Sequence, residues 1–362
     1  MPRDPGLLTC AGATSVAICL FLAAVTSATA QTLTAESINA ARLNVILATY
    51  SAEPKQLDPI TTSSTGTAGI AVQPEQTLGR EVGANMPSPA IARLQVLLDR
   101  AGTSPGVIDG LDGGNLRGAL EAFETMRGLP ADGKIGPLVI DAIENANQVI
   151  GTYVITAEDM SFVVGPIPKD YARMAEMRFL GYTTAAEGLA ERFHMGESFL
   201  RELNPGASFV EGETIFVADL AAKRSGKAAR IEVDKAKGQL RAYTADGSLL
   251  VAYPATIGSE TNPSPSGTHT VKIVVNNPDY TYNPKVNFKQ GDNDKVLTLP
   301  PGPNGPVGTV WIDLSEPTFG IHGTPEPDRI DKTGSHGCVR LTNWDAEELA
   351  KLATKGIPVK FL

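Results

Sequence analysis

The last third of the chain consists of short apolar segments separated by Gly, Asn, Asp and Pro, a pattern typical of strands joined by turns. The expected strands are residues 231–233, 239–243, 248–253, 269–275 and 359–362. One helix is expected among them, because Thr342 and Asp345 form a helix-start pattern and Gly356 follows the last apolar turn near Ala353. This pattern predicts a mainly β domain over residues 229–362.

The preceding residues predict smaller units, since 362 residues exceed one ordinary domain. An amphipathic helix over residues 31–50 is followed by a stretch rich in Thr, Ser, Gly, Pro and Gln, so residues 31–87 are assigned to a helix and a flexible linker. Apolar residues at helical spacing in 91–98 and 116–126 predict a small α-helical module over residues 88–146.

The formal charge of the chain argues against nucleic acid as a partner. The chain has 40 Asp and Glu against 31 Lys and Arg, and the net charge of −9 provides no attraction for phosphates. Hydrophobic residues make up 42% of the chain, which is enough for packed cores and excludes a disordered or fibrous protein.

The N-terminus has the features of a secretory signal peptide over residues 1–30. Its apolar segment, Ala13–Val25, is too short to span a membrane. Arg3 precedes this segment, and residues 28–30 (Ala-Thr-Ala) provide a small-residue site for cleavage before Gln31. We therefore expect an exported protein of the periplasm or cell envelope with no transmembrane segment after cleavage; an uncleaved signal anchor is the alternative.

Cleavage would remove Cys10 and Cys19 and leave Cys338 as the only cysteine. Two of the four histidines, His322 and His336, lie within 16 residues of it. Because a thiol of ordinary pKa, about 8.5, is mostly protonated at neutral pH, a nucleophilic cysteine needs a nearby base or positive charge. The cluster predicts a cysteine nucleophile with a histidine base that titrates near neutral pH.

Two other interpretations of this cluster fit less well. A buried, inert cysteine normally has aliphatic neighbours, whereas Cys338 has His336, Gly337 and Arg340 near it. A zinc site formed by His322, His336 and Cys338 has suitable ligand types but lacks a fourth ligand at regular spacing.

The motif consists of residues 321–324, Ile-His-Gly-Thr, and residues 334–340, Gly-Ser-His-Gly-Cys-Val-Arg. It resembles the L,D-transpeptidase (YkuD) family, whose motif is His-Gly-Thr, a spacer and Ser-His-Gly-Cys-x-Arg. The resemblance covers roughly residues 231–362 and implies a β-sandwich or barrel with a short C-terminal helix. Asp331 replaces the usual Gly of the spacer, and because Asp tolerates a left-handed backbone, we expect the turn to be kept.

The resemblance also implies a role for each residue of the motif. Cys338 would be the nucleophile, His322 the base, and the carbonyl of Gly323 the group that orients the imidazole. The remaining residues of the site would bind substrate and its oxyanion, the backbone N–H of Cys338 serving as a further oxyanion donor. They are Gly337, His336, Ser335 and Arg340, with Arg340 either orienting a substrate carboxylate or bracing the loop. No metal or other cofactor is implied.

Two accessory regions show weaker resemblances. Residues 88–146 are similar to a small peptidoglycan-binding module, although Glu124 replaces its usual Gln and Pro137 its usual Thr; a helical spacer without a ligand is the alternative. Residues 152–219 look like a degenerate LysM module, a small α+β glycan-binding fold. Its expected elements are helices at 185–193 and 197–203 and a strand at 214–217.

The implied function is a peptidoglycan L,D-transpeptidase. Cys338 would take the acyl group of a stem tetrapeptide, release D-Ala, and transfer the acyl group to an amine of another stem, a lipoprotein or a D-amino acid. With water as acceptor the same site would be an L,D-carboxypeptidase or hydrolase. The alternative from another class is a catalytically silent protein that binds cell-wall glycan.

Five further residues have expected positions. His269 is expected to pack rather than to catalyse, and His194 to lie on an accessory helix at the surface or in the core. Tyr280, Tyr282 and Trp311 are expected to form either a substrate wall or core.

Overall fold

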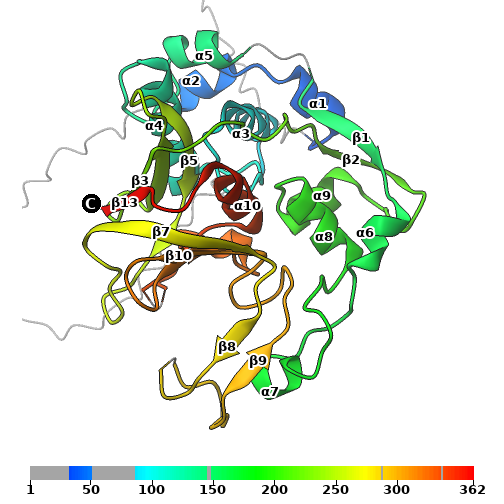
Figure 1. The fold of residues 1–362 in the computed structure, drawn as a ribbon. Helices are drawn as coiled ribbons and strands as arrows, with labels where there is room; N and C mark the ends of the chain where they lie inside the picture. The colour runs from blue at the N-terminus through cyan, green and yellow to red at the C-terminus, as the bar shows by residue number, and fades with distance from the viewer. Residues whose placement is uncertain (1–31, 51–85, 145–147, 287, 336) are drawn as a thin grey trace, which may run out of the picture. The chain divides into compact units, whose positions relative to one another are not determined.

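Figure 1 shows the fold in a computed structural model, which describes residues 32–50, 86–144, 148–286, 288–335 and 337–362. The expected signal peptide, most of the expected linker and His336 lie outside the described residues. Within these ranges, no helix is both long and apolar enough to cross a membrane.

Five helices form the N-terminal part of the described chain. They are α1 (Ala35–Ala40), α2 (Asn44–Tyr50), α3 (Pro89–Ala101), α4 (Gly114–Arg127) and α5 (Pro137–Ile143). The single helix expected over residues 31–50 is wrong, because the backbone leaves helical geometry at Ala41, with φ of −59° and ψ of 142°. The sequence analysis missed α5, which begins at Pro137 because the fixed φ of proline suits the first helical position.

The two helices expected in the helical module are confirmed as α3 and α4. Each ends at a glycine with a left-handed backbone, Gly102 after α3 and Gly128 after α4, the residue type that terminates a helix most easily. Leu98 of α3 and Phe123 of α4 are fully buried in one apolar core.

Residues 150–218 fold into a strand pair with helices between the strands. The elements are β1 (Ile150–Val154), α6 (Ala157–Ser161), α7 (Tyr171–Met174), α8 (Ala185–Arg192), α9 (Glu197–Leu203) and β2 (Thr214–Ala218), and β1 pairs antiparallel with β2. The expected helices α8 and α9 and the expected strand β2 are confirmed. The buried side chains of this region and those of the helical module form one continuous core, although the sequence suggested two separate modules.

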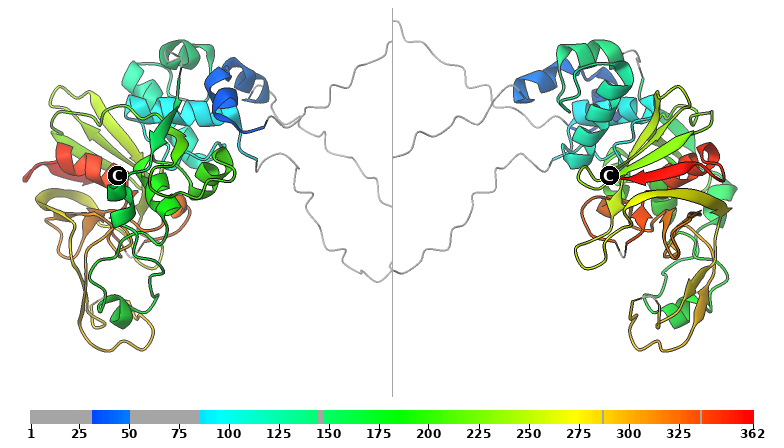
Figure 2. Two further views of the ribbon diagram at one scale, coloured as in Figure 1. Left: turned by 90° about the vertical axis from the view of Figure 1, so that its right-hand side faces the viewer. Right: turned by 60° about the vertical axis from the view of Figure 1, so that its left-hand side comes forward.

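A nine-stranded sheet is the centre of the C-terminal domain, seen from further sides in Figure 2. Its strands are β3 (Arg230–Asp234), β4 (Gln239–Tyr243), β5 (Leu249–Pro254), β6 (Thr256–Ile257), β7 (Gly267–Asn276), β10 (Val310–Leu314), β11 (Gly320–His322), β12 (Val339–Arg340) and β13 (Pro358–Phe361). The order is β5-β4-β3-β13-β7-β10-β11-β12-β6, with parallel pairing in β3–β13 and β11–β12. The prediction of a mainly β domain is confirmed.

One helix, α10 (Asn343–Leu352), packs against β10 and β11 and also contacts α8. It begins as the sequence predicted, since the Thr342 hydroxyl accepts a hydrogen bond of 3.2 Å from the Asp345 N–H. Leu349 and Leu352 bury their side chains in the apolar core of the sheet.

A separate hairpin extends from the sheet and lies beside α7 in Figure 1. It consists of β8 (Tyr280–Tyr282) and β9 (Leu297–Leu299), which pair antiparallel. Met174 and Leu180 of the accessory region share a small buried cluster with Tyr282 and Leu299 of the hairpin. This cluster joins residues far apart in sequence.

The turn that contains Asp331 follows a short 3-10 helix, η1 (Pro327–Arg329). Asp331 has a φ of 60°, so the left-handed turn expected from the usual glycine is kept. Its N–H donates a 2.9 Å hydrogen bond to the Thr256 hydroxyl, which fixes the turn against the edge of the sheet.

Replacing Asp331 tests this backbone requirement. We expect Asp331→Gly to leave stability nearly unchanged, and Asp331→Val to lower the free energy of unfolding by roughly 1–2 kcal/mol, because a β-branched residue resists the left-handed region. Urea unfolding of both variants measures the difference. An equal loss in both would contradict a backbone cause and point to the carboxylate itself.

Candidate active site

The two halves of the motif meet through a parallel strand pair. Ile321 of β11 pairs with Val339 of β12, and His322 pairs with Arg340. Cys338 directly precedes β12, one position before the residue that pairs with Ile321, and both Cys338 and His322 line one cavity. The loop between the strands returns the chain so that β12 runs parallel to β11.

The imidazole of His322 is held in one orientation. Its Nδ1 lies 2.7 Å from the Gly323 carbonyl oxygen, and the ring stacks on Trp311 with centroids 5.6 Å apart. Because a carbonyl oxygen only accepts hydrogen bonds, Nδ1 carries the proton and Nε2 keeps its lone pair. His322 thus presents a free basic nitrogen.

Burial shifts the pKa of both reacting groups toward the neutral forms. Burial, helped by the charge of Arg340, lowers the pKa of His322 to about 4. Burial raises the pKa of the Cys338 thiol, although the Gly320 N–H and Arg340 oppose this shift. The expectation of a base that titrates near neutral pH is therefore wrong for the resting protein, whose pair is a thiol and a neutral imidazole.

Hydrogen bonds shape the loop before the nucleophile. The Ser335 hydroxyl donates to the Cys338 carbonyl oxygen at 2.6 Å and accepts from the Gly337 N–H at 3.2 Å. Ser335 thus braces the loop, besides lining the cavity. Gly337 has a φ of 103°, and a Cβ there would lie 2.6 Å from the Phe319 ring, so only glycine fits.

Arg340 is half-buried beside the nucleophile. Its Nε is buried and has no hydrogen-bond partner within the part of the chain that the structure describes. Burial lowers the pKa of Arg340, and the nearby Glu326 carboxylate raises it. An Arg with an unpaired, buried Nε favours an anionic ligand over the alternative of a loop brace.

These groups surround a cavity of about 470 Å³. Its lining consists of Tyr171, Asn262, Tyr280, Val286, Phe288, Pro306, Val307, Trp311, Thr318, His322, Thr324, Pro325, Glu326, Ser335, Cys338 and Arg340. Tyr280 and Trp311 therefore belong to the cavity wall, whereas Tyr282 is fully buried. His269 packs edge-on against Phe361, away from this lining.

The structure adds a residue that the sequence did not indicate. Asn343, the first residue of α10, is buried, and a Cβ at Gly308 or Gly323 would overlap its side chain. Its Oδ1 accepts from the Thr309 N–H at 3.1 Å, and its Nδ2 donates to Glu191 of α8 at 2.9 Å. Asn343 supports the backbone that orients His322. An Asn after a helix cap carries no sequence signal for this role.

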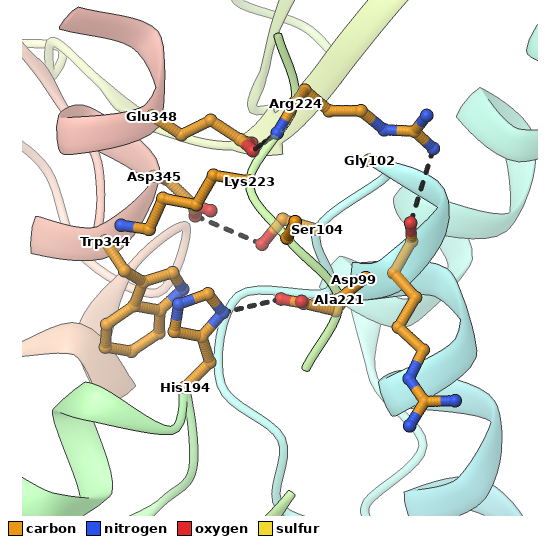
Figure 3. A pocket seen from close by; sticks show the side chains of 12 residues that line it. Asp99, Gly102, Ser104, His194, Ala221, Lys223, Arg224, Trp344, Asp345 and Glu348 are labelled. Atoms are coloured by element: carbon orange, nitrogen blue, oxygen red, sulfur yellow. Dashed lines mark hydrogen bonds and ion pairs between the residues drawn. The ribbon is translucent and has the colours of Figure 1, made fainter. Parts of the chain in front are cut away.

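Figure 3 shows a second polar cluster, where α3, the turn after α8 and α10 meet. The expectation that His194 lies on a helix is wrong, because α8 ends at Arg192 and His194 has a left-handed backbone with a φ of 57°. His194 bonds Asp99 at 2.8 Å and stacks on Trp344, and Ser104 donates to Asp345 at 3.1 Å. Burial raises the pKa of Asp345 to about 7. The cavity there is about 30 Å³, enough for one water molecule. The hydrogen bonds of the cluster join the accessory and catalytic parts of the chain.

Metal binding finds no support in this region. The described residues contain no group of three or more His, Cys, Asp or Glu that could hold a metal ion. His336, a ligand of the zinc site considered from the sequence, lies outside them.

Comparisons with known proteins find similarity in two parts of the chain. Residues 228–360 match the model of the L,D-transpeptidase catalytic domain, and residues 87–143 match that of a peptidoglycan binding domain. The chain is 29% identical over 176 residues to the L,D-transpeptidase YkuD of Bacillus licheniformis, covering 48% of this chain and 90% of the relative. It is 46% identical over 64 residues to the Bacillus subtilis YkuD, covering 18% and 39%. A crystal structure of an Enterococcus faecium L,D-transpeptidase aligns with a TM-score of 0.29 and 22% identity, over 40% of this chain and 53% of that one.

The fold and the site together define a mainly β enzyme domain built around the nine-stranded sheet. Residues 228–360 match the L,D-transpeptidase catalytic domain and residues 87–143 a peptidoglycan binding domain, and these matches with the named relatives support an L,D-transpeptidase enzyme.

The neutral thiol–imidazole pair predicts how Cys338 reacts in the absence of substrate. Alkylation by iodoacetamide requires the thiolate, so its rate should keep rising through pH 9 without a plateau near neutrality. Mass spectrometry of the peptide that contains Cys338 measures the rate, with urea-unfolded protein as the control of ordinary pKa. A plateau near pH 6–7 would instead indicate a thiolate–imidazolium pair.

Proposed function

We propose that this chain is an exported peptidoglycan L,D-transpeptidase with Cys338 as nucleophile and His322 as base. The observation that carries the proposal is the placement of three groups around one cavity: Cys338, an imidazole oriented by Gly323, and Arg340, whose buried Nε has no hydrogen-bond partner among the described residues. A peptide segment fits a cavity of about 470 Å³.

In the first half-reaction the Cys338 sulfur attacks the carbonyl carbon of a stem tetrapeptide. Nε2 of His322 takes the thiol proton, and the carbonyl oxygen becomes an oxyanion. This oxyanion accepts a hydrogen bond from the Cys338 N–H. The Gly337 N–H adds a second donor once it turns from Ser335 toward the oxyanion. Collapse breaks the C–N bond, and the imidazolium gives its proton to the departing D-Ala amine, which leaves a thioester on Cys338.

In the second half-reaction an amine from a second stem attacks the thioester. His322 takes the amine proton, and the tetrahedral intermediate collapses to a new amide and the free thiol. A lipoprotein amine or a D-amino acid reacts in the same way. With water as acceptor the product is a shortened, uncrosslinked stem, as in an L,D-carboxypeptidase.

Substrate binding makes His322 a stronger base than it is in the resting protein. The charge of Arg340 disfavours an imidazolium at His322. A substrate carboxylate bound to Arg340 neutralises that charge, so it raises the pKa of His322 toward its ordinary value. The site thus couples recognition of an anionic peptide to the basicity of His322.

The accessory regions fit an enzyme that works on the cell wall. A peptidoglycan binding domain over residues 87–143 would hold the chain on its polymeric substrate. We assign residues 152–219 to a LysM-like glycan-binding region and residues 1–30 to a signal peptide for export to the periplasm. A catalytically silent wall-binding protein would not require an oriented imidazole at His322. It would also not require the buried Nε of Arg340, which has no hydrogen-bond partner among the described residues.

Replacing the nucleophile tests the assignment. Incubated with purified tetrapeptide muropeptides, wild-type protein should release D-Ala and form dimers, which mass spectrometry identifies. Cys338→Ser should form none while unfolding at the wild-type temperature, because a hydroxyl is far less acidic than a thiol. Dimers from the Ser variant would refute the nucleophile, and shortened monomers from the wild type would identify water as acceptor.

Replacing the base tests the role of His322. Carbapenem-type β-lactams, which the family resemblance implies as acylating agents, should add one equivalent at Cys338 by intact mass. His322→Ala should slow this acylation by roughly 100- to 10,000-fold, the usual contribution of a general base. The wild-type acylation rate should fall only as the pH approaches about 4, where His322 becomes protonated. The variant should lack this acid limb of the pH–rate profile.

His336→Ala is the matched control for the base. It should keep the acid limb even if its rate falls, since His322 remains. Loss of the limb in His336→Ala with retention in His322→Ala would reverse the two roles.

A further inference from the structure

Part of the wall of the catalytic cavity comes from outside the matched catalytic domain. Tyr171, the first residue of α7, lines the cavity together with His322, Cys338 and Arg340. It precedes the first matched residue of that domain, residue 228, by more than fifty positions. The cavity is therefore composite, and the accessory segment supplies a side chain to it.

Hydrogen bonds hold this part of the segment to the loop between β8 and β9. The Gln290 side chain accepts from the Tyr171 N–H at 3.2 Å and donates to the Lys169 carbonyl oxygen at 2.7 Å. The Asn293 side chain donates to the Asp170 carboxylate at 3.1 Å. The backbone that carries Tyr171 is thus fixed on both sides of the residue.

A second set of contacts fixes the segment further along. The Leu180 N–H donates to the Pro301 carbonyl oxygen at 2.9 Å, and the Asn304 N–H donates to the Leu180 carbonyl oxygen at 3.0 Å. A Cβ at Gly302 would overlap the Leu180 carbonyl, so glycine permits this close approach. The accessory segment is docked on the catalytic domain at two separated places.

Aromatic contacts fix the ring of Tyr171. It packs edge-on against Tyr282 at 5.3 Å, Phe288 at 6.0 Å and Tyr280 at 6.1 Å between centroids. Three rings from the hairpin and its loop thus surround one ring from the accessory segment. A side chain needed only for this packing would not require a hydroxyl.

Tyr171 and Arg340 line the same cavity. Burial raises the pKa of Tyr171, and the guanidinium of Arg340 acts in the opposite direction. A hydroxyl that stays protonated is a hydrogen-bond donor, and a guanidinium is another. Two donors that line one cavity, one of them cationic, suit a carboxylate.

We propose that Tyr171 is a substrate-positioning residue, whose hydroxyl donates to the same C-terminal carboxylate of the peptide substrate that Arg340 binds. The inference rests on the proposed function and adds a specificity determinant from outside the catalytic domain. The site then requires an intact accessory segment and selects donor peptides that end in a free carboxylate.

Peptide binding to the full chain with the Cys338→Ser substitution tests the inference without turnover. Two tetrapeptides serve as ligands, one with a C-terminal carboxylate and one with a C-terminal amide, and calorimetry measures each Kd. Adding Tyr171→Phe should weaken binding of the acid about tenfold, as expected for a lost hydrogen bond to a charged group, and binding of the amide less than about twofold. In the Cys338 protein, the same change should raise KM for the acid and leave kcat nearly constant.

Tyr153→Phe is the control, since Tyr153 is an accessory tyrosine whose hydroxyl bonds Asp159 away from the cavity. It should leave both Kd values unchanged. Equal weakening of acid and amide by Tyr171→Phe, or no weakening, would overturn the positioning role. Failure of the Cys338 protein to release D-Ala would overturn the proposed function instead, and the two failures are measured separately.

Discussion

The parallel pairing of β11 and β12 is the contact on which the site depends. These two short strands bring His322 beside Arg340 and place Cys338 at the start of the second strand. A pair this short cannot hold its register alone, because each ladder residue contributes little. Its neighbours β10 and β6 complete the sheet on both sides, and Asn343 packs behind Gly323 where β11 ends. The geometry of the reacting groups is thus a property of the whole sheet and of the helix behind it.

Burial controls the chemistry of this pair as much as its geometry does. A solvent-exposed Cys–His pair would keep ordinary pKa values, whereas burial here moves the pKa of Cys338 up and that of His322 down. The resting thiol is therefore held in its protonated, less reactive form. The charge of Arg340 stabilises a thiolate at Cys338 and opposes an imidazolium at His322. A ligand that neutralises Arg340 therefore changes the pKa of both groups.

Sequence reasoning was most accurate where the signal was local. Six strands (β2, β3, β4, β5, β7 and β13), α10 with its Thr342 cap, and the left-handed turn at Asp331 follow from side-chain patterns and backbone preferences within a few residues. The contact between His322 and Gly323 was also expected from the motif. Asn343 and Tyr171 were missed because their roles arise from packing between elements more than a hundred residues apart, which no local pattern encodes. The acid shift of His322 was missed for the same reason, since burial depends on the complete fold.

The accessory regions make direct contacts with the catalytic domain around α10. Asp99 and Ser104 of the helical module reach the residues around α10 through His194 and Asp345, and Glu191 of α8 bonds Asn343. Each of these contacts ends on α10 or on a side chain stacked against it, and α10 packs against β11. The accessory regions therefore contact the same helix whose first residue, Asn343, packs against Gly323 beside His322.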